Sequence, residues 1–315
     1  MLDFPTQNFY TNRMNYSAYL ALLVLCSGLL SYSAAENREM NLWPTGVPGN
    51  EPKLPAEKDM TKDSENLVGG RRLIRLGNVS EPTITVYPAP KSKAHGGAVL
   101  VCPGGAYHIL ALDLEGKEVC DRLKEMGFTA ILLKYRVPRR QGLEKHEAPL
   151  QDAQRALGII RQHAAEWNID PDRIGVLGFS AGGHLAAVLS TGPQERTYPK
   201  VDEADSLSTR PSFTVLIYPG YLVEENDRTK IAPELVITKD TPQAFIAMTA
   251  DDPVKVENAL VYASALQQEK IPFELHIYPT GGHGYGLRKT DAPVTTWPDR
   301  LDEWFKSRGL TKKNE

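Results

Sequence analysis

The chain has 315 residues, of which 41% are hydrophobic and 24% are charged, and its formal net charge is −3. This is ordinary globular composition, with enough apolar residues for one sizeable core and a length that an α/β fold uses as a single domain. The mild acidity and the lack of a long basic run give no reason to expect a nucleic-acid partner.

Residues 1–35 have the pattern of an N-terminal extension with a signal peptide. Arg13 precedes an apolar run at 20–30, and small residues lead up to Ala35. This order is typical of a secretory signal cleaved after Ala35, and Met14 is a candidate start because the residues before it add no obvious signal. The apolar run is short for a transmembrane helix, although an uncleaved anchor is the alternative. We expect a secreted or periplasmic protein with no stable membrane insertion after cleavage.

Residues 36–315 predict a single α/β domain. Its first part, 36–70, is rich in proline, glycine and charge and predicts an extended lead-in on the surface. Apolar segments then predict strands at 83–87, 98–102, 128–133, 174–177, 213–218, 244–249 and 273–278. Helices are expected at 115–126, 149–167, directly after residue 180, at 257–270 and at 298–307. This alternation predicts a mostly parallel central sheet with helices on both faces, and ligands bind such sheets at the carboxyl ends of the strands.

The strongest motif is G-x-S-x-G at residues 178–182, Gly-Phe-Ser-Ala-Gly. An apolar strand runs into it and a helix of small residues follows, which is the setting of a nucleophile elbow. In such an elbow a sharp turn lifts the serine hydroxyl above the edge of the sheet. The glycines at 178 and 182 let the two backbones cross closely. Ser180 is therefore the predicted nucleophile.

A serine hydroxyl needs a neighbouring base, and the base needs an acid that orients it. His283 lies in a glycine-rich loop after the last predicted strand and is the best base. Asp251 and Asp252 both follow an earlier strand, which gives the chain order Ser, Asp, His of hydrolase folds. His184 lies one turn after Ser180 and is expected to have a structural role.

An oxyanion hole is expected from the backbone N–H groups of Gly104, Gly105 and Ala181. Such groups bind the negative charge that develops on a substrate carbonyl oxygen. The segment 103–106, Pro-Gly-Gly-Ala, is a variant of the H-G-G-G loop of lipases and esterases. The sequence has no paired Cys-x-x-Cys and no H-E-x-x-H spacing, so we expect neither a metal nor an organic cofactor.

With these motifs the chain resembles bacterial secreted α/β-hydrolases of the acetylxylan and feruloyl esterase group, some of which carry a xylanase-like label. The resemblance covers most of residues 40–308 and rests on the segments 103–107, 178–186, 249–254 and 281–286. It implies a serine esterase that works through an acyl-enzyme on an acylated carbohydrate or small ester. The resemblance also implies that the natural substrate carries O-acetyl groups on plant or algal polysaccharide.

Three further expectations depend on this resemblance. The segment from Asp251 to Lys255 resembles the D-x-x-V-P acid loop of the fold, where the first aspartate has the role, so Asp251 is preferred and Asp252 is the alternative. Tyr107 is an expected substrate-binding residue, because its ring could stack on a sugar. The segment 219–242 lies where many α/β-hydrolases carry a lid, and because it is short and polar it predicts a minimal lid and an open cleft, with a plain surface loop as the alternative.

Two other functions stay open. A serine peptidase of the prolyl-oligopeptidase type would use the same fold and the same chain order, but the short lead-in holds no propeller. A non-catalytic binding protein could keep the fold, but an intact Ser, Asp and His set weighs against it. The sequence does not indicate an oligomeric state.

Overall fold

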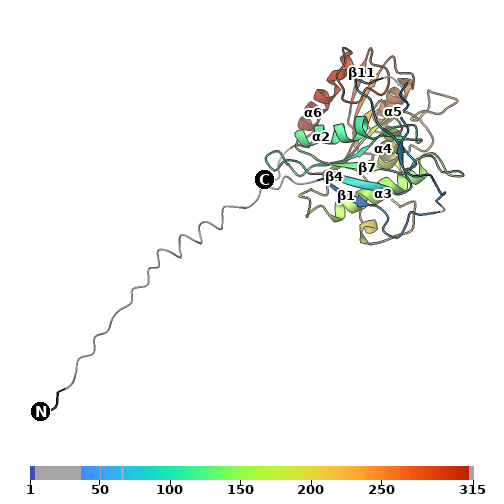
Figure 1. Cartoon of the computed structure of the whole chain (residues 1–315). Coiled ribbons are helices and arrows are strands. Elements are labelled where there is room, and N and C mark those ends of the chain that lie inside the picture. Colours follow the sequence, from blue (N-terminus) through green and yellow to red (C-terminus); the bar gives the residue numbers. More distant parts are fainter. Residues whose placement is uncertain (4–36, 50, 65–66, 312–315) are drawn as a thin grey trace. The chain divides into compact units, whose positions relative to one another are not determined.

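A central sheet of eight strands organises the fold (Figure 1). Its strands span Arg38–Asn41 (β1), Thr83–Tyr87 (β4), Ala98–Cys102 (β5), Thr129–Lys134 (β7), Ile174–Phe179 (β8), Phe213–Ile217 (β9), Gln243–Thr249 (β10) and Phe273–Tyr278 (β11). The order across the sheet is β1-β4-β7-β5-β8-β9-β10-β11. From β7 to β11 neighbouring strands are parallel, whereas β1 and β4 form an antiparallel edge. The mostly parallel sheet predicted from the sequence is confirmed.

The computed structural model describes residues 1–3, 37–49, 51–64 and 67–311. All of the strands belong to the compact unit Asn37–Glu315. The apolar run of the expected signal peptide and its cleavage point after Ala35 lie outside the described residues. Among the described helices, none combines the length and the apolar character that crossing a membrane requires.

Helices and a small sheet surround the central sheet. The helices span Asp113–Lys117 (η1, a π-helical turn), Glu118–Glu125 (α2), Glu147–Gln162 (α3), Ala181–Thr191 (α4), Glu203–Ser206 (η2), Glu257–Gln268 (α5), Pro293–Thr296 (η3) and Trp297–Ser307 (α6). The second sheet joins Lys58–Asp59 (β2), Arg75–Gly77 (β3) and Leu110–Ala111 (β6).

The helices cover both faces of the central sheet. Leu177 of β8 lies beside Val119 of α2 and Trp297 of α6. Gly178, the next residue along the strand, lies against Gly182 of α4. Because successive residues of a strand point to opposite faces, α2 and α6 cover one face and α4 covers the other. The strands between them are continuous apolar runs, and every residue of β5 and of β8 is buried.

The strand β1 is the main element that the sequence did not mark. It lies within 36–70, which the sequence predicted only as an extended lead-in. Its residues pair with β4, from Arg38 opposite Val86 to Asn41 opposite Thr83. The strand is at the edge of the sheet and mostly exposed, so no hydrophobic alternation reveals it.

The turn from β8 into α4 leaves no room for a side chain at Gly178 or at Gly182. A Cβ atom on Gly178 would lie 2.0 Å from the carbonyl oxygen of Gly182. A Cβ atom on Gly182 would lie 2.1 Å from the carbonyl oxygen of Cys102, at the end of β5. Both obstructing atoms belong to the backbone and cannot rotate away. The contact therefore fixes how close α4 lies to the carboxyl ends of β5 and β8.

We predict that Gly182→Ala destabilises the protein far more than Gly183→Ala. A Cβ atom on Gly183 would lie 3.1 Å from its nearest neighbours, both in Pro219, which a small shift relieves. Both variants gain about 1 kcal/mol of helix propensity, so their difference isolates the clash. Urea unfolding should show a loss of about 3 kcal/mol or more for Gly182→Ala. Equal stabilities of the two variants would contradict the close crossing.

Candidate active site

Ser180 has the strained backbone of a nucleophile turn. Its φ of 51° and ψ of −117° lie in a region that residues with a Cβ atom rarely adopt. The backbone is held there by three hydrogen bonds: its N–H donates to the Ile217 carbonyl, and its own carbonyl accepts from the N–H groups of His184 and Gly220, each at 3.1 Å. Such strain persists only where the surroundings over-determine it. Here it directs the hydroxyl away from the sheet.

His283 contacts the hydroxyl of Ser180. Its Nε2 lies 2.9 Å from the Ser180 Oγ, although 103 residues separate them in the chain. The imidazole is carried by a loop in which Gly281, Gly282 and Gly284 all have positive φ. Glycine adopts these angles without steric cost, which lets the loop turn the ring back over the sheet. The structure thus brings together the two side chains that the sequence selected as nucleophile and base.

The acid beside the imidazole is Asp252, and the preference for Asp251 is corrected. Asp252 is buried, and its Oδ2 lies 2.8 Å from the Nδ1 of His283. Its Oδ1 accepts from the N–H of Val254 at 2.7 Å, which fixes the carboxylate. The turn after β10 directs residue 252 inward and residue 251 outward. A choice between adjacent residues depends on that turn and could not be read from the pattern.

Asp251 instead shapes the loop that carries the imidazole. Its carboxylate accepts from the N–H groups of Gly282 at 2.9 Å and Gly281 at 3.2 Å. The bond from Gly282 is the main reason that the pKa of Asp251 lies below its usual range. Asp251 is exposed, and among the described residues it makes no hydrogen bond with the imidazole of His283.

Gly104 is not free to bind an oxyanion, which corrects its expected role. Its N–H donates to Oε2 of Glu115 at 2.6 Å. Ala181 is the first residue of α4, so its N–H has no acceptor within the helix, and the N–H of Gly105 has no acceptor within the described part of the chain. Gly105 has a φ of +136° and lines the cleft beside Ser180. Gly105 and Ala181 therefore remain the two candidate donors.

Tyr107 does not face a substrate, which corrects the expectation of a stacking residue. Its side chain is fully buried, and its hydroxyl lies 2.8 Å from the Nδ1 of His184. His184 has the structural role that the sequence predicted, since its Nε2 lies 3.0 Å from Oε1 of Glu234. Burial lowers the pKa of His184 to about 4. Tyr107 thus anchors the loop after Gly105 to the nucleophile helix.

Glu115 is the functional residue that the sequence analysis missed. It lies in η1, where the sequence predicted the start of an ordinary helix, and it is buried. Its Oε1 accepts from the hydroxyl of Tyr218 at 2.9 Å, while Oε2 holds Gly104. Burial raises its pKa, and the bonds from Gly104 and Tyr218 oppose that rise. The ring of Tyr218 packs edge-on against His283 at 4.8 Å, so Glu115 connects the oxyanion loop with the triad. In the sequence, the only sign of this role is a charged residue between Leu114 and Gly116.

Ser180 and His283 open into a cleft of about 830 Å³. Gly105 and Ala106 form part of its wall, and His108 and Tyr221 add polar and aromatic surface. The remaining wall is largely apolar and includes Val68, Leu73, Ile109 and Leu114. A concave site with a few polar groups at one end is typical of a small-molecule or sugar-ester pocket.

Comparison with known proteins places this site in a family. The BD-FAE family matches residues 84–217, which include Ser180. The chain is similar to the acetyl ester-xyloside bifunctional hydrolase of Caldicellulosiruptor lactoaceticus, with 33% identity and a TM-score of 0.65 over 87% of this chain and 97% of that one. This chain belongs to the acetylxylan esterase and xylanase-like esterase group of α/β-hydrolases.

Two curated members of this group are longer than the present chain. An acetylxylan esterase of Xylanibacter ruminicola is 32% identical over 244 residues, which is 70% of this chain and 47% of that protein. The endo-1,4-beta-xylanase B of Butyrivibrio fibrisolvens is 31% identical over 204 residues, or 59% of this chain and 32% of that protein. The aligned region therefore spans about half of the first and a third of the second.

The two aspartates can be separated by substitution. We predict that Asp252→Asn lowers kcat for a 4-nitrophenyl ester by about 10⁴, because an amide cannot hold the imidazole in the same tautomer. Asp251→Asn should have a much smaller effect, since its side-chain oxygen still accepts from one glycine N–H. Proton NMR gives an independent readout: the downfield Nδ1 proton of His283 should be lost in the first variant and kept in the second. The reverse result would restore Asp251 as the acid.

Glu115 should affect turnover through the oxyanion loop. We predict that Glu115→Ala lowers kcat by about 10²–10³ with little change in KM, as loss of one oxyanion donor does, because Gly104 loses its anchor and Gly105 shifts. Glu115→Gln keeps a carbonyl for Gly104 and should recover most of the rate. Circular dichroism checks that both variants fold. Equal rates in the alanine and glutamine variants would show that the carboxyl oxygen does not position the loop.

Proposed function

We propose that this chain is a serine carboxylic ester hydrolase that removes O-acetyl groups from plant or algal polysaccharide. One observation carries the proposal: the Ser180 hydroxyl lies 2.9 Å from the Nε2 of His283, whose Nδ1 lies 2.8 Å from the buried Asp252. A nucleophile, a base and an orienting acid in this order are what acyl transfer requires.

In the proposed mechanism Ser180 Oγ attacks the carbonyl carbon of the ester while His283 Nε2 takes its proton. Asp252 stabilises the imidazolium, and the N–H groups of Gly105 and Ala181 bind the oxyanion. The imidazolium then gives its proton to the departing alcohol oxygen as the C–O bond breaks, which leaves an acetyl-serine. A water molecule, deprotonated by His283, then attacks the carbonyl carbon of the acetyl-serine; the bond from that carbon to Ser180 Oγ breaks, Oγ takes the proton back from the imidazolium, and acetate leaves.

The choice of an acetylated sugar is supported by the relatives and the cleft. The similar proteins are named as an acetylxylan esterase and as an acetyl ester-xyloside hydrolase. A cleft of about 830 Å³ leaves room for the sugar on which a small acyl group is carried. A panel of acetylated xylan, 4-nitrophenyl acetate, longer acyl esters, a feruloyl ester and a Pro-linked chromogenic peptide tests the assignment. Cleavage of the peptide without release of acetate would favour the peptidase instead.

Substitution of the nucleophile tests the mechanism directly. Ser180→Ala should lower kcat by about 10⁶ and should abolish labelling by a serine-reactive phosphonate. Ser206→Ala, which removes an exposed hydroxyl in η2, is the matched control and should change neither. Turnover by Ser180→Ala above the residual rate left by binding and the oxyanion hole would refute the assignment.

We also propose that the protein is exported and cleaved after Ala35. The supporting features are Arg13, the apolar run at 20–30 and the small residues before the cleavage point. In a bacterial host the full chain should yield an exported product whose first residue is Glu36, as read by N-terminal sequencing. An Ala35→Asp variant should accumulate uncleaved. An exported product that retains residues 14–35 would indicate an uncleaved anchor.

A further inference from the structure

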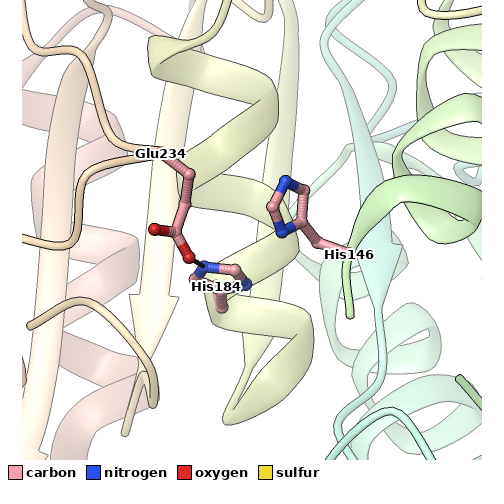
Figure 2. A group of neighbouring side chains, drawn as sticks. All are labelled: His146, His184 and Glu234. Carbon is pink, nitrogen blue, oxygen red and sulfur yellow. Dashed lines mark hydrogen bonds and ion pairs between the residues drawn. The ribbon is translucent and has the colours of Figure 1, made fainter. Parts of the chain in front are cut away.

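Two histidines and a glutamate meet beside the nucleophile helix, and none of the three lines the catalytic cleft. His146 precedes α3, His184 lies in α4, and Glu234 lies in the segment between β9 and β10. Figure 2 shows the three side chains pointing toward one another from these separate elements. One nitrogen of each imidazole and one carboxylate oxygen all lie within 4.8 Å of one another. The proposed reaction uses none of the three.

Two of these side chains are already held in position. His184 is fully buried, and its Nε2 lies 3.0 Å from Oε1 of Glu234. Its other nitrogen, Nδ1, lies 2.8 Å from the hydroxyl of Tyr107. A hydrogen bond to the far nitrogen is the usual way in which proteins orient a histidine ligand. With its proton on Nδ1, the neutral ring would present the Nε2 lone pair to a metal.

The hydrogen bond between His184 and Glu234 leaves one feature of His146 unexplained. Its Nδ1 is buried and has no hydrogen-bond partner within the described residues. Buried polar atoms in folded proteins are nearly always paired, so this nitrogen lacks an expected partner. A cation between His146, His184 and Glu234 would satisfy it.

The cluster can be reached from solvent. His146 and Glu234 line a second cavity of about 1220 Å³, whose wall also contains Tyr221 and Arg228. A metal ion could enter by this route, and a water molecule could occupy the position that faces the cavity. Entry and an open coordination position are both required of a three-ligand site.

We propose that His146, His184 and Glu234 form a zinc-binding site. Two imidazoles and one carboxylate are the ligand set of several three-ligand zinc sites, with water in the fourth place. The ion would replace the hydrogen bond between His184 and Glu234. The proton of the neutral His184 ring would then lie on Nδ1, and this N–H would donate a hydrogen bond to the Tyr107 oxygen. Zinc would then join the start of α3, the nucleophile helix α4 and the segment that follows β9.

Lys145 competes with the ion for the carboxylate. Its Nζ lies 3.1 Å from Oε1 of Glu234 and 5.5 Å from the ring centre of Tyr221. A divalent cation at the same carboxylate would repel the ammonium group, so metal binding would displace it toward the cavity. Removal of this charge should therefore strengthen metal binding, while loss of a ligand should weaken it. These opposite directions distinguish a metal site from a hydrogen-bonded cluster.

The test is a cobalt titration of the purified protein, prepared without a polyhistidine tag and stripped with a chelator. Co²⁺ should bind with a stoichiometry of one per chain and give the intense visible bands of four-coordinate cobalt, which Zn²⁺ should then abolish. His146→Ala and Glu234→Gln should each weaken binding by more than about 100-fold, beyond the effect of losing an outer contact. Lys145→Met should bind more tightly than the wild type. His163→Ala, which removes a surface histidine paired with Glu166, is the control and should bind normally.

Zinc should also raise the melting temperature of the wild type and of His163→Ala but not that of Glu234→Gln. This second measurement, with circular dichroism, separates loss of a ligand from loss of the fold. The absence of cobalt bands in the wild type would overturn the proposal. So would binding that persists in both ligand variants, or weaker binding in Lys145→Met.

Discussion

The close crossing of α4 over the ends of β5 and β8 determines the geometry of the whole site. Gly182 leaves no room for a side chain against the carbonyl of Cys102, and Gly178 leaves none against Gly182. Because the obstructing atoms are backbone, the nucleophile turn and the loop after β5 cannot approach each other more closely than they do. Gly104, in that loop, would place a Cβ atom 2.8 Å from the Cβ of Ser180. The strain at Ser180 is sustained by this packing and not by the serine itself.

A buried polar network extends that rigidity to the base. Glu115 accepts hydrogen bonds from Gly104 and from Tyr218, and the Tyr218 hydroxyl accepts in turn from the N–H of Gly286, near His283. Removing a carboxyl group from water costs free energy unless its oxygens are satisfied, and here both oxygens have a donor. The result is a connection from the oxyanion loop, through one carboxyl group, to the loop that carries the imidazole. Loops far apart in the sequence thus share one set of hydrogen bonds.

The sequence predicted what depends on local pattern and missed what depends on turns and distant neighbours. Ser180 and His283 could be identified because a strand-turn-helix motif and a glycine-rich loop each have a local signature. Asp252 could not be separated from Asp251, since a single residue of turn geometry decides which carboxylate faces inward. Gly104 was assigned as a donor because nothing local reveals that Glu115, 11 residues later, occupies its N–H.

The difference between local pattern and distant contacts also explains which strands the sequence predicted. Strands such as β5 and β8 are buried on both faces, so composition alone marks them. The edge strand β1 is mostly exposed and charged, and only its pairing with β4 defines it. Tyr107 was wrongly predicted for a similar reason. An aromatic residue beside a catalytic loop suggests a substrate contact, but the hydroxyl of Tyr107 is hydrogen-bonded to the buried His184.

His184 connects the helix that carries Ser180 to two other segments of the chain. Through its two nitrogens it joins Tyr107, which follows Gly105 and Ala106, to Glu234, in the segment between β9 and β10. Tyr221, from the same segment, stacks on Tyr107 at 6.2 Å and also lines the catalytic cleft. Glu234 is therefore connected to the loop that contains Tyr107 through the two nitrogens of His184. The segment after β9 thus contributes Gly220 and Tyr221 to the wall of the cleft, and its Glu234 is hydrogen-bonded to the helix that carries Ser180.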